Sequence, residues 1–430
     1  MTRLVITGGT LIDQTGTRAG DVAIDDGRIV EVGTAVTGDC VLDASGCIVS
    51  PGFVDLHVHL REPGKEEAET IETGSRAAAL GGFTAVVAMP NTDPAQDCVA
   101  VVDFVREQGR KAGLCDVLPS GCITIGRAGE LLAPFGELAA AGVHLFTDDG
   151  NGVQDAQLMR RALEYARPLG IVLAQHCEVA SLTKGAVMHE GACCSRLGLP
   201  GWPSIAEELM VFRDIELVRL TGVPMHFLHL STERSVQLVR QAKADGLPVT
   251  AEAAPHHFTL TDEMLAGYDS VFKVTPPLRT AVDIAALKVG LADGTIDAIA
   301  TDHAPHAQHT KEAPLDQAPP GMLGLETALA LAITELSGSG AAMTLEQIVA
   351  ALSWKPAAIA GVAHRHGRPI AAGEPANLTV FDPTREWSVV PAHLASKSRN
   401  TPYAGRTLRG KVRHTVFDGT AVVVDSAATR

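Results

Sequence analysis

Two histidines one residue apart, His57 and His59, are the first candidates for chemistry in this sequence of 430 residues. His57 ends a short apolar run, Phe53–His57, and His59 lies two residues further on. Residues i and i+2 of a strand project to the same side, so both imidazoles could bind one metal ion. Such a pair is weak evidence alone. Further ligand-type side chains follow other apolar runs: Asp148, Asp149, His176, His229 and Asp302.

The elements that would position these side chains are apolar runs alternating with helix-like segments, a pattern typical of parallel βα units. The runs are Phe53–His57, Thr84–Met89, Asp116–Pro119, Val143–Phe146, Ile171–His176, Met225–His229, Val249–Ala253 and Ala298–Thr301. Helical segments such as Glu66–Leu80 and Ile205–Leu220 end at glycines. The pattern predicts an α/β fold, a (β/α)₈ TIM-type barrel whose strand ends meet on one face. The alternative, an open doubly wound sheet, would need a G-x-G-x-x-G turn, which is absent.

Both chain ends show short alternating runs separated by turn signals. The turns are Asp26-Gly27, Ser45-Gly46 and Asp418-Gly419, and we expect tight β-hairpins there. We therefore predict one small β-sandwich domain composed of residues 1–51 and 366–430, with the barrel in residues 52–365.

Composition excludes several classes of partner. Lys and Arg total 35 against 50 Asp and Glu, a net charge of −15, which disfavours nucleic acid. The apolar stretches fall short of the roughly 18 residues of a membrane span, so no membrane role is expected. The eight cysteines form no C-x-x-C pair, and the first residues lack a secretory segment. We expect buried, reduced thiols and a cytoplasmic protein.

The donor set consists of imidazoles and carboxylates without thiolate, which favours Zn²⁺, with Mn²⁺ or Co²⁺ as replacements. We expect one or two ions per subunit, and two rather than one. Two ions would share a bridging carboxylate and a bridging hydroxide, as in metal-assisted hydrolysis. Side-chain chemistry alone does not decide between Asp148 and Asp149 as the bridge.

Six segments in combination resemble the type I dihydroorotases of the amidohydrolase superfamily. They are Pro51–Gly64, Met89–Thr92, Phe146–Gly150, Gln175–Glu178, Pro276–Arg279 and Ala300–His306. The resemblance runs through most of the chain. It implies reversible cyclisation of N-carbamoyl-L-aspartate to L-dihydroorotate in pyrimidine biosynthesis.

The resemblance also implies a role for each matching residue. One zinc would be bound by His57, His59, Asp149 and Asp302, and the second by Asp149, His176 and His229, with Asp302 as general acid and base. Many members of the superfamily use a carboxylated lysine as the bridge, but the fourth run has no lysine, so Asp149 is expected to bridge. The substrate would contact His59, Arg61, Asn91, Thr275, His306, Pro320 and Gly321, its carboxylate lying on Arg61, Asn91 and His306.

Two positions depart from the family pattern. Thr275 stands where asparagine is usual, and Pro320, which has no backbone N–H, stands where an aromatic residue is frequent. The long segment Ala304–Gly321 is interpreted as a binding loop. His256 and His257 are interpreted as structural, and His303 and His309 receive no role.

Three alternatives stay open at this level. Arg61 could instead pair with Glu62. The enzyme could be a hydantoinase, dihydropyrimidinase or allantoinase, whose ring substrates need not carry a carboxylate. An inactive homologue could serve as a structural partner of aspartate carbamoyltransferase, although that hypothesis predicts lost ligands and none of the six is lost. A homodimer and an association with aspartate carbamoyltransferase are further expectations.

Overall fold

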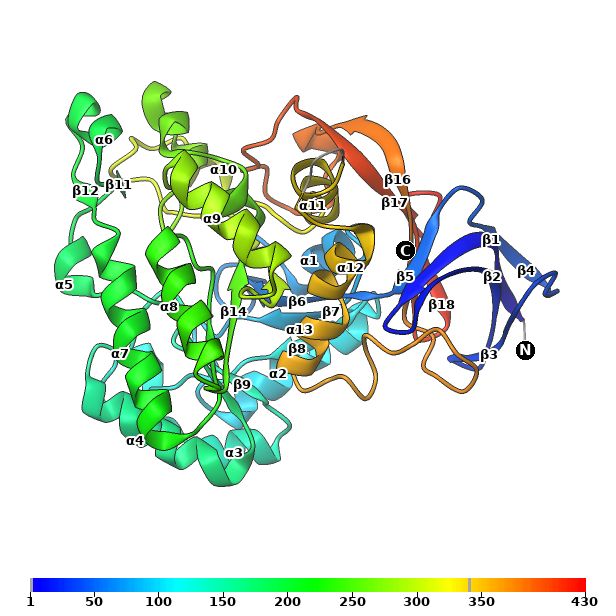
Figure 1. The fold of residues 1–430 in the computed structure, drawn as a ribbon, viewed down its shortest axis with the longest axis horizontal. Coiled ribbons are helices and arrows are strands. Elements are labelled where there is room, and N and C mark those ends of the chain that lie inside the picture. Colours follow the sequence, from blue (N-terminus) through cyan, green and yellow to red (C-terminus); the bar gives the residue numbers. More distant parts are fainter. Residues whose placement is uncertain (1–2, 339–341) are drawn as a thin grey trace.

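Eight parallel strands form a closed barrel in the computed structural model, which describes residues 3–338 and 342–430 (Figure 1). Strands β6–β8 pair with one another, and the other five form a second sheet. Parallel bridges from Gly121 to Phe146 and from Val58 to His303 join the two sheets and close the barrel. The (β/α)₈ prediction is confirmed. The strands are β6 (Phe53–Val58), β7 (Phe83–Ala88), β8 (Asp116–Pro119), β9 (Leu145–Phe146), β10 (Val172–Gln175), β13 (Met225–Phe227), β14 (Val249–Ala253) and β15 (Ala298–Ile299).

Within the described residues, each barrel strand is followed by a helix that covers the barrel, and after β10 and β15 shorter helices come before it (Figure 1). The covering helices are α1 (Ile71–Leu80), α2 (Val99–Ala112), α3 (Phe135–Ala140), α4 (Ala156–Ala166), α7 (Ile205–Thr221), α8 (Glu233–Ala244), α9 (Ala281–Ala292) and α11 (Ala328–Leu336). The predicted start of α1 at Glu66 is wrong. Thr70 caps this helix through a capping box with Thr73, so the helix begins at Ile71.

The barrel interior is filled at its amino end. Val54, Leu56, Ala85 and Val87 belong to one buried cluster with Ala357, which lies on α13 (Trp354–Ile359). This helix follows α12 (Leu345–Leu352) and packs against β6 and β15. Because apolar side chains occupy the amino end, the open space of the barrel is left at the carboxyl ends of the strands.

Strands from both chain ends form one nine-stranded sheet in the order β19-β18-β17-β16-β5-β1-β2-β3, with β4 also paired to β1 (Figure 1, blue and red). The two ends meet where β16 pairs antiparallel with β5. This confirms the predicted β domain. The strands are β1 (Leu4–Asp13), β2 (Gly16–Asp25), β3 (Arg28–Gly33), β4 (Cys40–Asp43), β5 (Ile48–Pro51), β16 (Leu378–Ser388), β17 (Thr407–Phe417), β18 (Thr420–Val424) and β19 (Ala427–Ala428).

Two of the three predicted hairpins are present. Asp26-Gly27 joins β2 to β3, and Asp418-Gly419 joins β17 to β18, both antiparallel pairs. The hairpin at Ser45-Gly46 is wrong. Strands β4 and β5 both run parallel to β1 and pair with successive stretches of it, so this turn carries the chain onward along β1 instead of reversing it.

Three segments outside the barrel strands surround the carboxyl ends. The first follows β10 and contains α5 (Ala180–Thr183), β11 (Met188–His189), α6 (Ala192–Leu197) and β12 (Gly201–Trp202). The second, residues 304–321, is irregular apart from α10 (Gln308–Lys311). The third is residues 389–406, between β16 and β17, where Asn400 bonds to Ala304 and Gly321.

All eight cysteines are free thiols. Six are buried as predicted, but Cys40 and Cys98 are exposed, because they lie at the start of β4 and at the amino-terminal cap of α2. Within the described residues, no helix combines the length and the apolar character needed to cross a bilayer.

Phe381 of β16 joins the β domain to the barrel, since its ring lies 6.1 Å from that of the fully buried Phe53. We expect Phe381→Ala to destabilise the protein by about 3–5 kcal/mol, as large-to-small core changes do. Thermal unfolding measures this, with Phe104→Ala on α2 as control because that residue is 38% exposed. Equal shifts in Tm for both variants would contradict the assigned packing.

Candidate metal centre and substrate cavity

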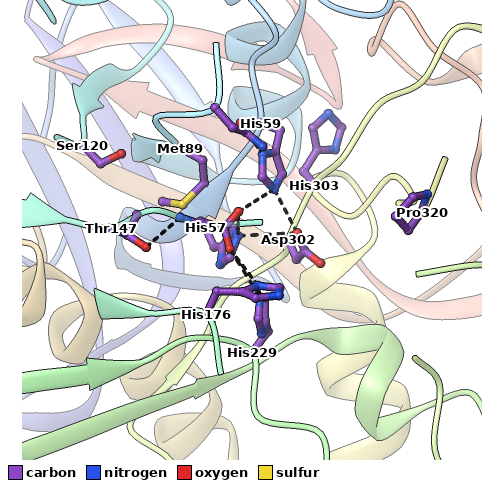
Figure 2. A network of polar contacts seen from close by, with 12 residues as sticks. His57, His59, Met89, Ser120, Thr147, His176, His229, Asp302, His303 and Pro320 are labelled. Atoms are coloured by element: carbon purple, nitrogen blue, oxygen red, sulfur yellow. Dashed lines mark hydrogen bonds and ion pairs between the residues drawn. The ribbon is translucent and has the colours of Figure 1, made fainter. Parts of the chain in front are cut away.

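Four imidazoles and two carboxylates converge where the barrel strands end (Figure 2). His57 lies in β6, and the others lie just beyond β6, β9, β10, β13 and β15. Nε2 of His57 and Nε2 of His59 lie 3.3 and 3.5 Å from Oδ2 of Asp149. On the opposite side, His176 Nδ1 and His229 Nε2 lie 3.3 and 3.4 Å from Oδ1 of the same carboxylate. Asp149 therefore stands between two pairs of imidazoles.

The ring nitrogens of His57 and His59 that face away from the cluster are fixed as donors. His57 Nδ1 lies 2.8 Å from Oε1 of Glu252, and His59 Nδ1 lies 2.9 Å from Oδ1 of Asn91. Carboxylate and amide oxygens only accept, so in both rings Nδ1 carries the proton. Nε2 then presents a lone pair to the cluster, and that of His57 is buried without a hydrogen bond among the described residues.

The second pair of imidazoles has a related arrangement. His176 Nε2 lies 3.2 Å from Glu178, which leaves Nδ1 turned toward the cluster. That nitrogen is 2.9 Å from Nε2 of His229. A proton can lie between these two nitrogens, or both nitrogens can donate their lone pairs to a cation.

This arrangement fits a metal site. Lone pairs of imidazoles and carboxylates face one another, and outer partners hold the ring nitrogens in the ligating tautomer, as is typical of metal-bound histidines. Two overlapping groups have ligand atoms close enough for one ion each, namely His57, Asp149 and His229, and His57, His59 and Asp302. The described residues can thus hold metal.

The imidazoles and carboxylates of the cluster shift one another's pKa values. Burial alone would raise the pKa of the Asp149 and Asp302 carboxyls, but the neighbouring imidazoles outweigh it and hold both pKa values below the usual range. Burial would lower the pKa of His176, yet Asp149 and Glu178 raise it to about 9. Protons and metal therefore compete for the same nitrogens.

Asp148 and Asp149 have different environments. Asp148 accepts hydrogen bonds from the backbone N–H of Ile123 at 2.8 Å and of Thr124 at 3.0 Å, and from the Thr124 hydroxyl. Its acceptors are thus committed to the loop after β8. Of these two carboxylates, Asp149 is the one that faces the imidazoles, and no lysine lines the adjoining cavity within the described residues.

Three site residues have left-handed backbone angles that side chains other than glycine seldom adopt. The φ values are 64° for Arg61, 30° for His229 and 47° for Asp302. Such strain persists only where surrounding contacts enforce it, and it concentrates at functional sites.

A cavity of about 300 Å³ opens beside the cluster. All the residues predicted for the site line it except His57, which lies beneath it. Its lining consists of His59, Arg61, Asn91, Asp149, Gly150, His176, Glu178, Trp202, His229, Val274, Thr275, Asp302, Ala304, His306, Pro320 and Gly321.

Arg61 supplies the positive charge of this cavity. Its Nε donates to the carbonyl of Pro305 at 3.0 Å, which orients the guanidinium plane and leaves the terminal nitrogens for a ligand. Burial lowers its pKa to about 10, so it remains charged at neutral pH. The alternative pairing with Glu62 does not occur, because Glu62 accepts from the backbone of Ile71 at 2.8 Å.

Residues 304–321 contact Arg61 and supply a further part of the cavity lining. His306 Nε2 donates to the carbonyl of Pro320 at 2.8 Å and lies 3.3 Å from Nη2 of Arg61. Burial, followed by the charge of Arg61, lowers the pKa of His306 to about 3, so the ring is neutral. Gly321 has φ 137°, and a Cβ there would lie 2.8 Å from His306 Nε2, so only glycine fits.

Sequence reasoning missed two residues, one that holds a ligand histidine from behind and one that lines the cavity. Glu252 in β14 binds both His57 and His226, and these hydrogen bonds outweigh burial and lower its pKa to about 2. A glutamate inside an apolar strand was the available signal. Trp202 joins the lining from β12, and no sequence pattern indicated this.

Three further histidines, His256, His257 and His303, lie around the site. His257 bonds to the carbonyl of Pro276 at 2.9 Å, and His256 Nε2 lies 3.8 Å from Asp302. His303 accepts from the backbone of Gly324 and contacts Glu69, so it joins the barrel closure to α1.

Comparison with solved structures identifies the architectural class. The L-hydantoinase of Arthrobacter aurescens superposes with a TM-score of 0.87 at 24% identity, covering 100% of this chain and 98% of that one. A dihydropyrimidinase from Brevibacillus agri has a TM-score of 0.87 at 23% identity, with 99% and 96% covered. The fold is that of the cyclic amidohydrolases, a TIM barrel with a β domain from both chain ends.

Sequence comparison identifies the family. A family model described as dihydro-orotase-like matches residues 46–235. Dihydroorotase of Pelotomaculum thermopropionicum is 51% identical over 427 residues, 98% of this chain and 99% of the relative. That of Streptomyces coelicolor is 48% identical with both chains fully covered, and that of Mycobacterium tuberculosis 49% identical with 94% and 95% covered. The chain belongs to the dihydroorotase family.

We expect Asp149→Ala to lose bound metal and Asp148→Ala to keep it, because only the first carboxylate faces both pairs of imidazoles. Elemental analysis after dialysis measures the metal content. Asp148→Ala should instead lower Tm, because it leaves the two N–H groups it binds without a partner. Full metal content in Asp149→Ala, or a larger loss in Asp148→Ala, would contradict the assignment.

Proposed function

We propose that the protein is a dihydroorotase that interconverts N-carbamoyl-L-aspartate and L-dihydroorotate. The observation that carries the proposal is Arg61, a buried guanidinium in the same cavity as the metal-type cluster. A planar guanidinium pairs well with a carboxylate, and both proposed substrates carry one. The names of relatives about 50% identical along almost the whole chain support the same reaction.

The proposal includes two zinc ions per subunit. His57, His59, Asp149 and Asp302 would hold one, and Asp149, His176 and His229 the second. Bound zinc supplies Lewis acidity toward the amide carbonyl and makes water acidic enough to attack at neutral pH. Metal analysis of protein purified without chelators should give a ratio near two.

Substrate orientation would come from the rim of the cavity. Arg61 would bind the carboxylate through its terminal nitrogens. Asn91 would add its amide N–H₂, because its oxygen is already engaged by His59. Neutral His306 and the Thr275 hydroxyl would bind polar edges of the ring, and Gly321 lets the chain approach closely.

Asp302 would move the proton. In hydrolysis its carboxylate would take a proton from the attacking water and return it to the ring nitrogen as the C–N bond breaks. In cyclisation it would take the proton from the carbamoyl nitrogen as the C–N bond forms and give it to the carboxyl oxygen that leaves as the C–O bond breaks. The neighbouring imidazoles hold its pKa below the usual range, so at neutral pH the carboxylate is ionised and has a lone pair free to accept a proton.

Turnover of dihydroorotate, hydantoin, dihydrouracil and allantoin by metal-loaded protein tests the proposal. We expect activity with dihydroorotate and with carbamoyl aspartate in the reverse direction. Preference for an uncharged ring would favour the hydantoinase group. No turnover at full metal content would favour the inactive homologue.

The proposal extends to assembly and location. We propose a cytoplasmic homodimer that can associate with aspartate carbamoyltransferase. An apolar row along the outer face of α7 supports a protein contact, since Leu209, Phe212 and Leu220 are 46%, 52% and 62% exposed. Light scattering, alone and with that enzyme, measures both associations.

We expect Arg61→Met to raise KM for dihydroorotate about 10- to 100-fold, the cost of losing a charge-assisted hydrogen bond. Metal content should stay unchanged, because Arg61 is not a ligand. Arg110→Met is the control, since its side chain is 78% exposed. An unchanged kcat/KM toward dihydroorotate would contradict carboxylate binding by Arg61.

We expect Asp302→Asn to lose about 10²–10⁴-fold in kcat in both directions, because an amide cannot shuttle a proton. Part of the metal should remain, since the amide oxygen still offers a ligand atom. Steady-state kinetics together with metal analysis separate these effects. A kcat near that of the wild type would assign the proton transfer to another group.

A further inference from the structure

Lys311, at the end of α10, points its ammonium group into the protein instead of into solvent. The side chain is buried, and Nζ donates to three backbone carbonyls, those of Lys273 at 3.4 Å, Pro319 at 3.0 Å and Gly321 at 3.2 Å. An ammonium has three N–H donors, so its hydrogen-bonding capacity is fully used.

Lys273 makes the reciprocal contact from the other side. Its Nζ donates to the carbonyls of Leu315 at 2.7 Å and Asp316 at 3.1 Å, within residues 304–321. Its own carbonyl accepts from the backbone N–H of Gly321 at 2.9 Å as well as from Lys311. Two lysines and one backbone bond therefore join residues 304–321 to the segment that follows residue 272.

The joined segments lie next to each other, and both line the substrate cavity. Val274 and Thr275 follow Lys273 directly. The carbonyl of Gly321 accepts from Lys311, and Pro320 lies between Gly321 and Pro319, whose carbonyl also accepts from Lys311. Asn400 closes the same assembly from residues 389–406, donating to the carbonyls of Ala304 at 3.0 Å and Gly321 at 3.1 Å.

We propose that Lys311 and Lys273 form a clamp that holds these two lining segments together and so determines substrate affinity. Neither side chain lines the cavity, so both are positioning residues that act through Thr275, Pro320 and Gly321. The role as a determinant of affinity rests on the proposed function, whereas the clamp itself does not.

The energetics argue against Lys311 being an incidental surface lysine. A buried cation is costly unless it is paired, and all three partners of Lys311 are uncharged carbonyls. Burial, then repulsion from Lys273, lowers its pKa to about 7. The chain tolerates this cost at the point where three carbonyls of the cavity wall converge. A planar guanidinium could not reach the three from one atom, so arginine is not an equivalent residue here.

The clamp is tested with Lys311→Met, Lys311→Arg and Lys273→Met, with Lys111→Met as the exposed control. Hydrogen exchange of the peptides covering residues 311–323 reports on the clamp independently of enzyme activity. We expect faster exchange than in the wild type in all three clamp variants and an unchanged exchange rate in the control. Their KM for dihydroorotate should rise about tenfold or more, while kcat falls less and metal content stays full.

The two clamp residues should also depend on each other. The double variant Lys273→Met/Lys311→Met should raise KM by less than the product of the single effects, since either substitution loosens the contact between the same two segments. Multiplicative effects would mean separate roles and would overturn the clamp.

Other outcomes are equally decisive. Unchanged exchange in Lys311→Met, or full rescue by Lys311→Arg, overturns the clamp. Faster exchange with an unchanged KM overturns its role in affinity. Wild-type protein that fails to turn over dihydroorotate refutes the proposed function, while the exchange data still decide whether the clamp exists.

Discussion

The arrangement at the barrel mouth depends on one electrostatic constraint, the convergence of imidazole and carboxylate lone pairs around Asp149. Such groups repel one another unless a cation lies between them. His57 and His229 approach Asp149 within 3.3 and 3.4 Å from opposite sides, so the carboxylate can serve both halves of the cluster. Without metal, protons must take that place, which explains why the pKa of His176 is raised. The fold is thus adapted to hold positive charge at this point.

The surrounding barrel maintains this constraint through partners buried behind the ligands. Glu252, Asn91 and Glu178 each fix the outward nitrogen of one imidazole, so the inward nitrogen keeps its lone pair. These groups are costly to bury, and the hydrogen bonds that they accept offset that cost. Parallel strands can supply both the ligands and the residues that hold them, because the ligands lie at strand ends and Glu252 lies within a strand, β14.

Around the cluster, long segments provide the cavity walls that strands cannot. Arg61 and His306 bring donors to the cavity, and the backbone near Gly321 lines it beside them. Irregular backbone holds its position only if its carbonyls and N–H groups find partners. Lys311, Lys273 and Asn400 supply those partners, so the C-terminal segment contributes to a cavity otherwise built by the barrel.

The sequence alone determined the barrel and the ligand-type residues, because both follow from local pattern: apolar runs predict strands, and ligands follow the runs. The β domain from both ends was predictable in the same way. Tertiary structure decided what depends on pairing across the chain. It separated Asp148 from Asp149 by where each carboxylate finds N–H donors, and it aligned β4 and β5 along β1 where a hairpin was expected. It also brought Glu252 behind His57 and Lys311 against Lys273, since residues 195 and 38 positions apart leave no local signature.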